Sequence, residues 1–171
     1  MIAQYLLKNG QILEIEQDTD SENPNDWENG ITLFFNHRQC FIKPKDTQFV
    51  DKAPDGYWKL AVSAYIHSGI ELSLGRTSGW DSSNLGYVLI SQKEFPDLTK
   101  ATTIVEGFID DWNTYLAGDV TIMSIYDIKV CECCKNESRE LIECVGGFYG
   151  TDPATNGMEE YLPAKIEKQI K

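Results

Sequence analysis

The segment that most restricts the fold of this chain is 99–117, where apolar residues recur at the spacing of an amphipathic helix. The apolar stripe consists of Ile104, Val105, Phe108, Ile109, Trp112, Tyr115 and Leu116. Either Asp97 or Thr99 can cap the start of the helix, and Gly118 can end it. A stripe of this width has to be buried, so the rest of the chain must supply a surface on which the helix packs.

The surface predicted from the other segments is a β-sheet. Two short strands are expected around Asn9-Gly10, the residue pair that a type I′ hairpin turn favours. Further strands are expected at 31–42, 60–74 with a break at Gly69, 86–91, and 120–134 and 139–149 around a turn at 135–138. A last helix is expected from about 157 to 170. The sequence therefore predicts a single α+β domain, residues 1–171, with a mostly antiparallel sheet, one long helix at about 99–117 and a C-terminal helix.

The chain is strongly acidic, with 27 Asp and Glu against 15 Lys and Arg and a net charge of −12. Lys8 is the only basic residue among the first thirty, and residues 17–30 are expected to form an acidic loop. On the predicted helix, Glu106 and Asp110 stand one turn apart with Asp111 beside them. Like charges at this spacing destabilise a helix by roughly 0.2–0.5 kcal/mol, so local stability does not explain them.

An acidic surface of this kind repels nucleic acid and anionic membranes and attracts basic protein surfaces. We therefore expect a basic protein as the partner, with no direct binding of nucleic acid or membrane. The carboxylates expected to contact that partner are Asp18, Asp20, Glu22, Asp26, Glu28, Glu106, Asp110 and Asp111. The alternative is that the charge serves solubility alone.

The chain shows none of the sequence features of export or membrane insertion. It has no run of about 18 apolar residues that could span a bilayer, and its start at Met1 lacks the basic and apolar regions of a signal peptide. Its five cysteines, an odd number, do not resemble a disulfide framework. Reduced thiols in a cytoplasm are therefore expected.

The cysteines can be metal ligands or small core residues. Cys131 and Cys134 have Cys-x-x-Cys spacing, and a turn centred on 136–137 would bring Cys144 near Cys131, with Cys40 as a distant fourth ligand. Only one such pair is present, and cysteine is among the residue types most often buried. We therefore expect no stoichiometric zinc and no other cofactor.

A second class of function is a small enzyme that uses His67 as a general base oriented by Asp81. Its nucleophile would be one of three serines, Ser68, Ser82 or Ser83. None of them lies in the Gly-x-Ser-x-Gly motif that exposes a nucleophilic serine on a strained turn. A hydrogen-bonded histidine in a hairpin, followed by Asp81 in a turn, accounts for the same residues without catalysis.

Four groups of residues between about 60 and 160 form a distinctive set. They are Tyr65-x-His67-Ser68-Gly69-Ile70, Trp80-Asp81-Ser82, Gly86-Tyr87-Val88, and Gly147-Phe148-Tyr149-Gly150 with Asn156-Gly157-Met158. The set resembles a family of small acidic proteins of unassigned function that is found in bacteriophages and mobile elements. The resemblance implies a protein that acts in the cytoplasm of a bacterial host, where such accessory proteins frequently counter host defence. Several inhibitors of CRISPR nucleases and restriction enzymes are similar in size and charge, and they imitate the phosphate surface of DNA.

Charge and resemblance together favour a non-enzymatic acidic binding protein of phage or mobile-element type. By analogy, it would inhibit a host defence system of the CRISPR or restriction type by binding a basic, nucleic-acid-binding protein surface. One alternative is the small enzyme, acting through His67 and Asp81 on a nucleotide-like ligand. The other is a structural or packaged accessory protein of a phage.

This interpretation predicts that the protein does not retain duplex DNA or RNA at physiological salt. Binding to duplexes depends on a basic footprint that neutralises phosphates, and the positive excess of residues 31–60 is only +2. A gel-shift titration should therefore show no complex at micromolar protein. A sub-micromolar complex would contradict the prediction.

Overall fold

The computed structural model describes residues 1–44 and 47–171. The chain divides into two compact units, and each contains its own five-stranded antiparallel sheet. Met1–Ser21 and Gly118–Lys171 form the first, which we call the split unit, and Glu22–Ala117 form the second, which we call the central unit. The α+β class is confirmed. That the chain is a single domain stays a prediction, because compactness does not say whether either unit folds alone.

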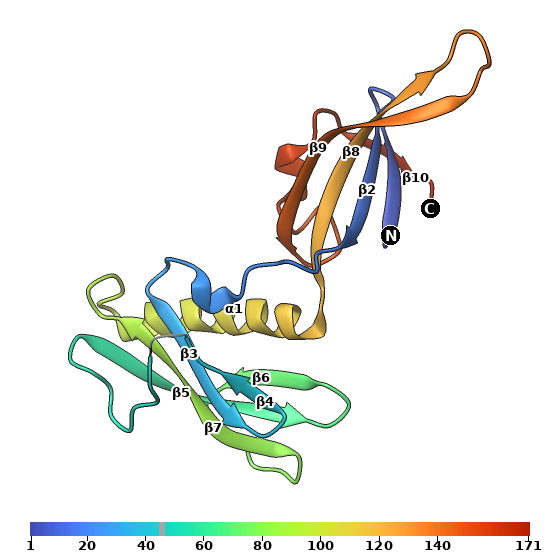
Figure 1. Ribbon diagram of the computed structural model, residues 1–171. Coiled ribbons are helices and arrows are strands. Elements are labelled where there is room, and N and C mark those ends of the chain that lie inside the picture. The colour runs from blue at the N-terminus through green and yellow to red at the C-terminus, as the bar shows by residue number, and fades with distance from the viewer. Residues whose placement is uncertain (45–46) are drawn as a thin grey trace. The chain divides into compact units, whose positions relative to one another are not determined.

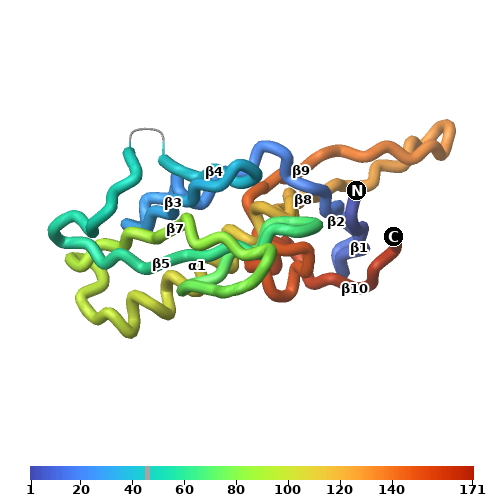
Figure 2. The backbone as a smooth tube through the Cα atoms, turned by 90° about the horizontal axis from the view of Figure 1, so that it is seen from below, coloured from blue at the N-terminus to red at the C-terminus, as the bar shows by residue number. Residues whose placement is uncertain are grey.

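The sheet of the split unit has the order β10-β1-β2-β8-β9. Its strands are β1 (Ala3–Leu7), β2 (Ile12–Gln17), β8 (Val120–Val130), β9 (Glu137–Tyr149) and β10 (Ile166–Gln169). Alternating residues on one face form the core, where Leu7, Leu13, Ile15, Met123 and Ile125 are fully buried. This face is closed by Met158 from the short 3₁₀ helix η2 (Met158–Tyr161). Figure 2 shows β1 and β10 side by side at one edge of the sheet.

The hairpin between β1 and β2 is confirmed, but its turn differs from the expected type I′. Gly10 donates its N–H to the Leu7 carbonyl (2.9 Å), and Leu7 donates its own N–H to the Gln11 carbonyl (2.9 Å). A type I′ turn needs positive φ at both central residues, whereas here Gly10 has φ +87° and Asn9 is not left-handed. The loop therefore has three residues, with the glycine at the position that only glycine adopts at no cost.

The prediction of a C-terminal helix from about 157 to 170 is wrong. The segment instead contains η2 and then β10, which pairs with the outer edge of β1. Pro163 explains the difference, because a proline inside a helix removes one hydrogen bond and clashes with the preceding turn. Pairing with β1 satisfies the backbone of this segment instead.

The hairpin of β8 and β9 continues beyond the rest of its sheet. Ile12, the first residue of β2, pairs with Tyr126, and past that point β8 and β9 pair only with each other. We call residues 127–140 the ribbon, a two-stranded extension that Figure 1 shows running past the end of β2. Val130 pairs with Glu137, so the turn occupies 131–136 rather than the expected 135–138.

The sheet of the central unit has the order β4-β3-β7-β5-β6. Its elements are the 3₁₀ helix η1 (Pro24–Asp26), β3 (Ile31–His37), β4 (Cys40–Ile42), β5 (Tyr57–Ile66), β6 (Ile70–Leu74), β7 (Ser82–Ser91) and the helix α1 (Leu98–Ala117). The expected strands at 31–42 and 60–74 are each a hairpin, and the turn of the second lies at Gly69 as predicted.

Helix α1 lies across one face of this sheet (Figure 1) and confirms the predicted helix. Its buried residues are Ala101, Val105, Phe108, Ile109 and Trp112, which pack on apolar side chains of the strands. Asp97 caps the start, because its Oδ1 accepts the N–H groups of Thr99 (2.8 Å) and Lys100 (3.2 Å). Gly118, with φ +75°, follows the last turn.

Two asparagine side chains link the helices α1 and η1 to the central sheet, by hydrogen-bonding to strand backbone groups that no neighbouring strand pairs with. The Asn113 amide of α1 accepts the Leu72 N–H (2.7 Å) and donates to the Leu72 carbonyl (3.0 Å) on the edge strand β6. Asn25 of η1 makes the same pair of bonds with Leu33 of β3 (2.7 and 2.8 Å). Each amide therefore replaces one residue of a missing neighbouring strand.

Replacing Asn113 with Ala should destabilise the central unit by about 1–3 kcal/mol, because the half-buried Leu72 backbone loses both partners. All four tryptophans belong to the central unit, so urea unfolding followed by tryptophan fluorescence reports on it. Asn84→Ala is the matched control, since Asn84 makes the same two bonds to the exposed Thr77. Water can replace these, and an equal loss in both variants would contradict the argument.

Candidate functional site

The carboxylates of α1 face away from the core of the central unit. Glu106 and Asp110 are exposed and lie one helical turn apart, as predicted from their spacing, while Asp111 is half-buried. The buried positions Val105, Phe108 and Ile109 alternate with them along the helix. The packing of the apolar stripe therefore forces Glu106 and Asp110 toward solvent.

Two further carboxylates lie on a segment that packs beside α1. The Trp27 ring meets the Phe108 ring edge to face, with ring centroids 6.3 Å apart, and so anchors this segment on the helix. Asp26 and Glu28 flank Trp27 in the sequence, and both are exposed. We call Asp26, Glu28, Glu106, Asp110 and Asp111 the acidic surface. Glu22, the first residue of the central unit, is also exposed.

No side chain among the described residues neutralises the negative charge of the acidic surface. Within residues 1–44 and 47–171, none of its five carboxylates forms an ion pair with a lysine, arginine or histidine. The ion pairs that do form there use Glu14, Glu16, Asp81 and Glu140. The acidic surface can therefore accept charge-assisted hydrogen bonds from the cations of another molecule.

One member of the acidic surface is unfavourable for folding when it is charged. Burial raises the pKa of Asp111 above its usual value, and the neighbouring negative charge of Asp110 raises it further. The folded state therefore binds this proton more tightly than the unfolded state does. Protonation of Asp111 therefore stabilises the folded state. This stabilisation is fully present below the pKa of Asp111 in the unfolded chain and is lost as the pH rises through its pKa in the folded chain.

Asp18 and Asp20 were predicted to act with the other carboxylates, but they belong to the split unit. The Asp18 carboxylate accepts the Gly147 N–H of β9 (2.9 Å) and the Asp20 N–H (3.1 Å). Asp18 is therefore a structural residue that holds a left-handed glycine of β9 in place. The expected acidic loop at 17–30 is thus not one element, because it runs from one unit into the other and contains η1.

His67 and Asp81 lie in a polar cleft of about 300 Å³ in the central unit. The cleft is formed by the β3–β4 turn with His37 and Arg38, the β5–β6 turn with His67, and the start of β7. Trp80 also lines the cleft and is fully exposed. The sequence did not reveal that His37 and Arg38 belong here, because only the pairing of the strands brings the two turns together.

The residues of this cleft do not form a catalytic relay. The His67 Nδ1 and Asp81 Oδ2 atoms are 3.7 Å apart, which is longer than a hydrogen bond, and both side chains are largely exposed. In the part of the chain that the structure describes, no serine hydroxyl hydrogen-bonds to His67. The His37 Nδ1 accepts the Gln39 N–H (3.2 Å), which is a local turn contact. A nucleophile activated by a base is thus not in place.

The cysteines do not form the predicted set of ligands. Cys40 is buried in β4 of the central unit, where burial raises its pKa. Cys144 lies on β9 opposite Ser124, whose hydroxyl donates to its sulfur (3.5 Å), so it is several residues along the strand from the turn. The prediction centred the turn three residues too late, which is why it placed Cys144 near Cys131.

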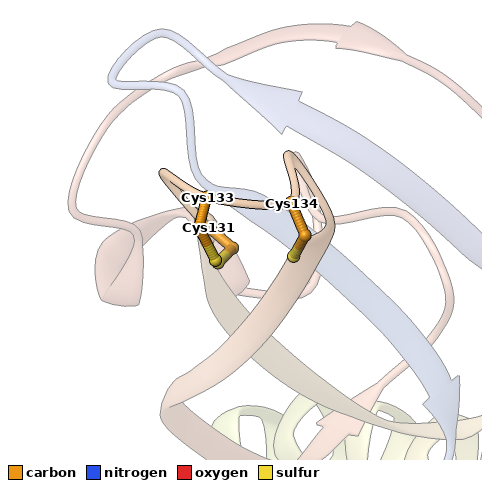
Figure 3. A group of neighbouring side chains, drawn as sticks. All are labelled: Cys131, Cys133 and Cys134. Carbon is orange, nitrogen blue, oxygen red and sulfur yellow. The ribbon is translucent and has the colours of Figure 1, made fainter.

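Three cysteines do meet, in the turn at the tip of the ribbon (Figure 3). The Sγ atoms of Cys131, Cys133 and Cys134 all lie within 4.8 Å of one another, and those of Cys131 and Cys133 are 3.0 Å apart. A hydrogen bond from the Cys133 thiol, followed by backbone N–H groups and the Cys134 thiol, lowers the pKa of Cys131 to about 6. The same interaction raises the pKa of Cys133.

The comparisons with known proteins identify no relative. No protein-family model matches the chain, and no curated protein or solved structure matches it either. The resemblance to phage and mobile-element proteins therefore rests only on the groups of residues named in the sequence analysis. None of the helices in the described residues is both long and apolar enough to cross a membrane.

Replacing Asp111 with Asn should raise the melting temperature at pH 7, because the raised pKa of the carboxyl makes its charge unfavourable in the folded state. The gain should be small, up to about 0.5 kcal/mol, and should shrink toward about pH 4, near the usual pKa of Asp. Thermal melts followed by tryptophan fluorescence at both pH values test this. Glu159→Gln in the split unit is the control, and a gain for Asp111→Asn that does not vary with pH would contradict it.

Proposed function

We propose that this chain is a non-enzymatic binding protein whose acidic surface docks on a basic surface of another protein. The observation that carries the proposal is the set of carboxylates on α1 and the adjoining segment that find no cationic partner in the described residues. A partner that presents lysine and arginine would complete these charges and gain charge-assisted hydrogen bonds. Long-range attraction by the net charge of −12 would speed the encounter.

The class of partner follows from the chemistry of the acidic surface. A protein surface that binds nucleic acid carries arginines and lysines, which could pair with the carboxylates of the acidic surface. We infer that the partner is a nucleic-acid-binding protein of a bacterial host and that the chain competes with the nucleic acid for it. The phage-type setting, the cytoplasm of the host and an action against a CRISPR or restriction system rest on the resemblance of residues 60–160.

The alternative enzyme has less support from the geometry. His67 and Asp81 lie in one cleft, but their separation of 3.7 Å and their exposure leave the imidazole without the orienting hydrogen bond that a general base needs. Three carboxylates of the acidic surface, by contrast, lie on a helix whose position is set by burial and by Asn113. We therefore place the function in binding.

Reversing Glu106, Asp110 and Asp111 together to Lys should abolish capture of the partner from a bacterial lysate. The control reverses Glu159, Glu160 and Glu167 of the split unit, three exposed acidic residues, and so changes the net charge equally. Capture by the wild type and the control should be strong at about 50 mM salt and weak at about 500 mM, where screening is severe. Duplex DNA added to the wild-type complex should displace the captured protein.

Two outcomes would contradict this proposal. If the control reversals weaken capture as much as the reversals on α1, net charge rather than the acidic surface is responsible. If capture is indifferent to salt and to both sets of reversals, the interaction does not use these carboxylates at all.

A further inference from the structure

The turn at the tip of the ribbon has a composition that turn formation does not explain. Tight turns favour Gly, Pro, Asn, Asp and Ser, whereas residues 131–134 are Cys-Glu-Cys-Cys. All three cysteines are exposed, so they are not the small core residues that cysteines usually are. Their presence in this turn therefore needs a reason other than packing.

The backbone of the turn holds the three thiols in one place. Cys131 donates its N–H to the Asn136 carbonyl (2.9 Å), and Lys135 donates its N–H to the Cys131 carbonyl (2.9 Å). Lys135 is left-handed, with φ +58°, which closes the turn tightly. Below it, the paired strands from Asp127 to Val130 and from Glu137 to Glu140 support the turn. The three side chains converge on one side of the turn in Figure 3.

The distances between the sulfur atoms suit a shared metal ion. Thiolates bound to one cation at about 2.3 Å lie about 4 Å from one another. The three Sγ atoms already lie within 4.8 Å, so small side-chain rotations bring them to that spacing. No histidine or carboxylate belongs to this group among the described residues. The donor set is therefore three sulfurs, the softest ligands that a protein offers.

We propose that Cys131, Cys133 and Cys134 form a binding site for one Cu⁺ ion, held by three thiolates. Soft thiolates select Cu⁺ and Zn²⁺ among the common metals. Structural zinc sites are tetrahedral and closed by four protein ligands, of which this turn supplies only three. Cu⁺ accepts three thiolates in a plane and leaves no coordination position open. Binding releases the thiol protons and involves no change in the oxidation state of metal or sulfur.

This site differs from the zinc site that the sequence suggested. That set combined Cys131 and Cys134 with Cys144 and Cys40, and it omitted Cys133. In the structure, Cys144 lies on β9 several residues from the turn, and Cys40 lies in the central unit. Cys133 instead lies with Cys131 and Cys134. The proposal is also independent of the acidic surface, which lies in the central unit.

The test is a titration of the reduced full-length protein with Cu⁺ under anaerobic conditions, in competition with a chromophoric Cu⁺ chelator. One Cu⁺ per monomer is expected, with its stoichiometry confirmed by native mass spectrometry. Cys131→Ser, Cys133→Ser and Cys134→Ser should each lower the affinity at least about 10- to 100-fold, since loss of a ligand costs no less than loss of an outer-shell contact. Zn²⁺ in place of Cu⁺ should bind more weakly.

Cys144→Ser is the matched control, because Cys144 is also exposed and lies on the same hairpin but outside the cluster. Its Cu⁺ affinity should equal that of the wild type. Tryptophan fluorescence does not report on this unit, so circular dichroism should verify that each variant keeps its sheet. The proposal is overturned if no stoichiometric Cu⁺ binds, if the Cys144→Ser variant loses as much affinity as the others, or if Zn²⁺ binds more tightly than Cu⁺.

Discussion

The pair of hydrogen bonds between the Asn113 side chain and the Leu72 backbone decides how α1 lies on the central sheet. An apolar stripe alone does not fix the rotation of a helix about its axis, because burial is not directional. A bidentate amide on a strand edge is directional, and it fixes the rotation of the helix about its axis. It also covers part of the edge of β6, which would otherwise offer an unpaired template to another strand.

The acidic surface depends on this arrangement. Because Asn113 and the buried stripe fix the rotation of α1, the side chains of Glu106 and Asp110 are exposed to solvent. Asn25 acts in the same manner on β3, and together with the Trp27 ring it holds the neighbouring carboxylates beside the helix. A carboxylate array on rigid elements can meet a partner without first losing conformational entropy, which favours tight binding. The half-buried Asp111 shows that the chain keeps a charge which its own stability does not favour.

Features set by local periodicity were predictable from the sequence, whereas those set by register were not. The helix at 98–117 followed from the apolar spacing, Asp97 and Gly118, and the hairpins followed from glycines and alternation. The C-terminal helix failed because Pro163 and pairing with β1 outweighed a short pattern without clear periodicity. The cysteine cluster was missed because a shift of three residues in the centre of the turn exchanges one set of facing residues for another. A count of charges likewise says nothing about where each side chain lies. It therefore could not distinguish Asp18, which hydrogen-bonds to the backbone, from Glu106, which is exposed.

The division of the chain also has a consequence for the order of folding during synthesis. The central unit is continuous in sequence, so all of its strands and α1 are available as soon as Ala117 has left the ribosome. The β1–β2 hairpin emerges earlier but finds its neighbour β8 only after the whole central unit has been made. An isolated hairpin is marginally stable in water. The apolar side chains of Leu7, Leu13 and Ile15 therefore stay exposed to solvent until β8 has been synthesised. The split unit is thus the last to complete its core, although its first two strands are the first part of the chain to appear.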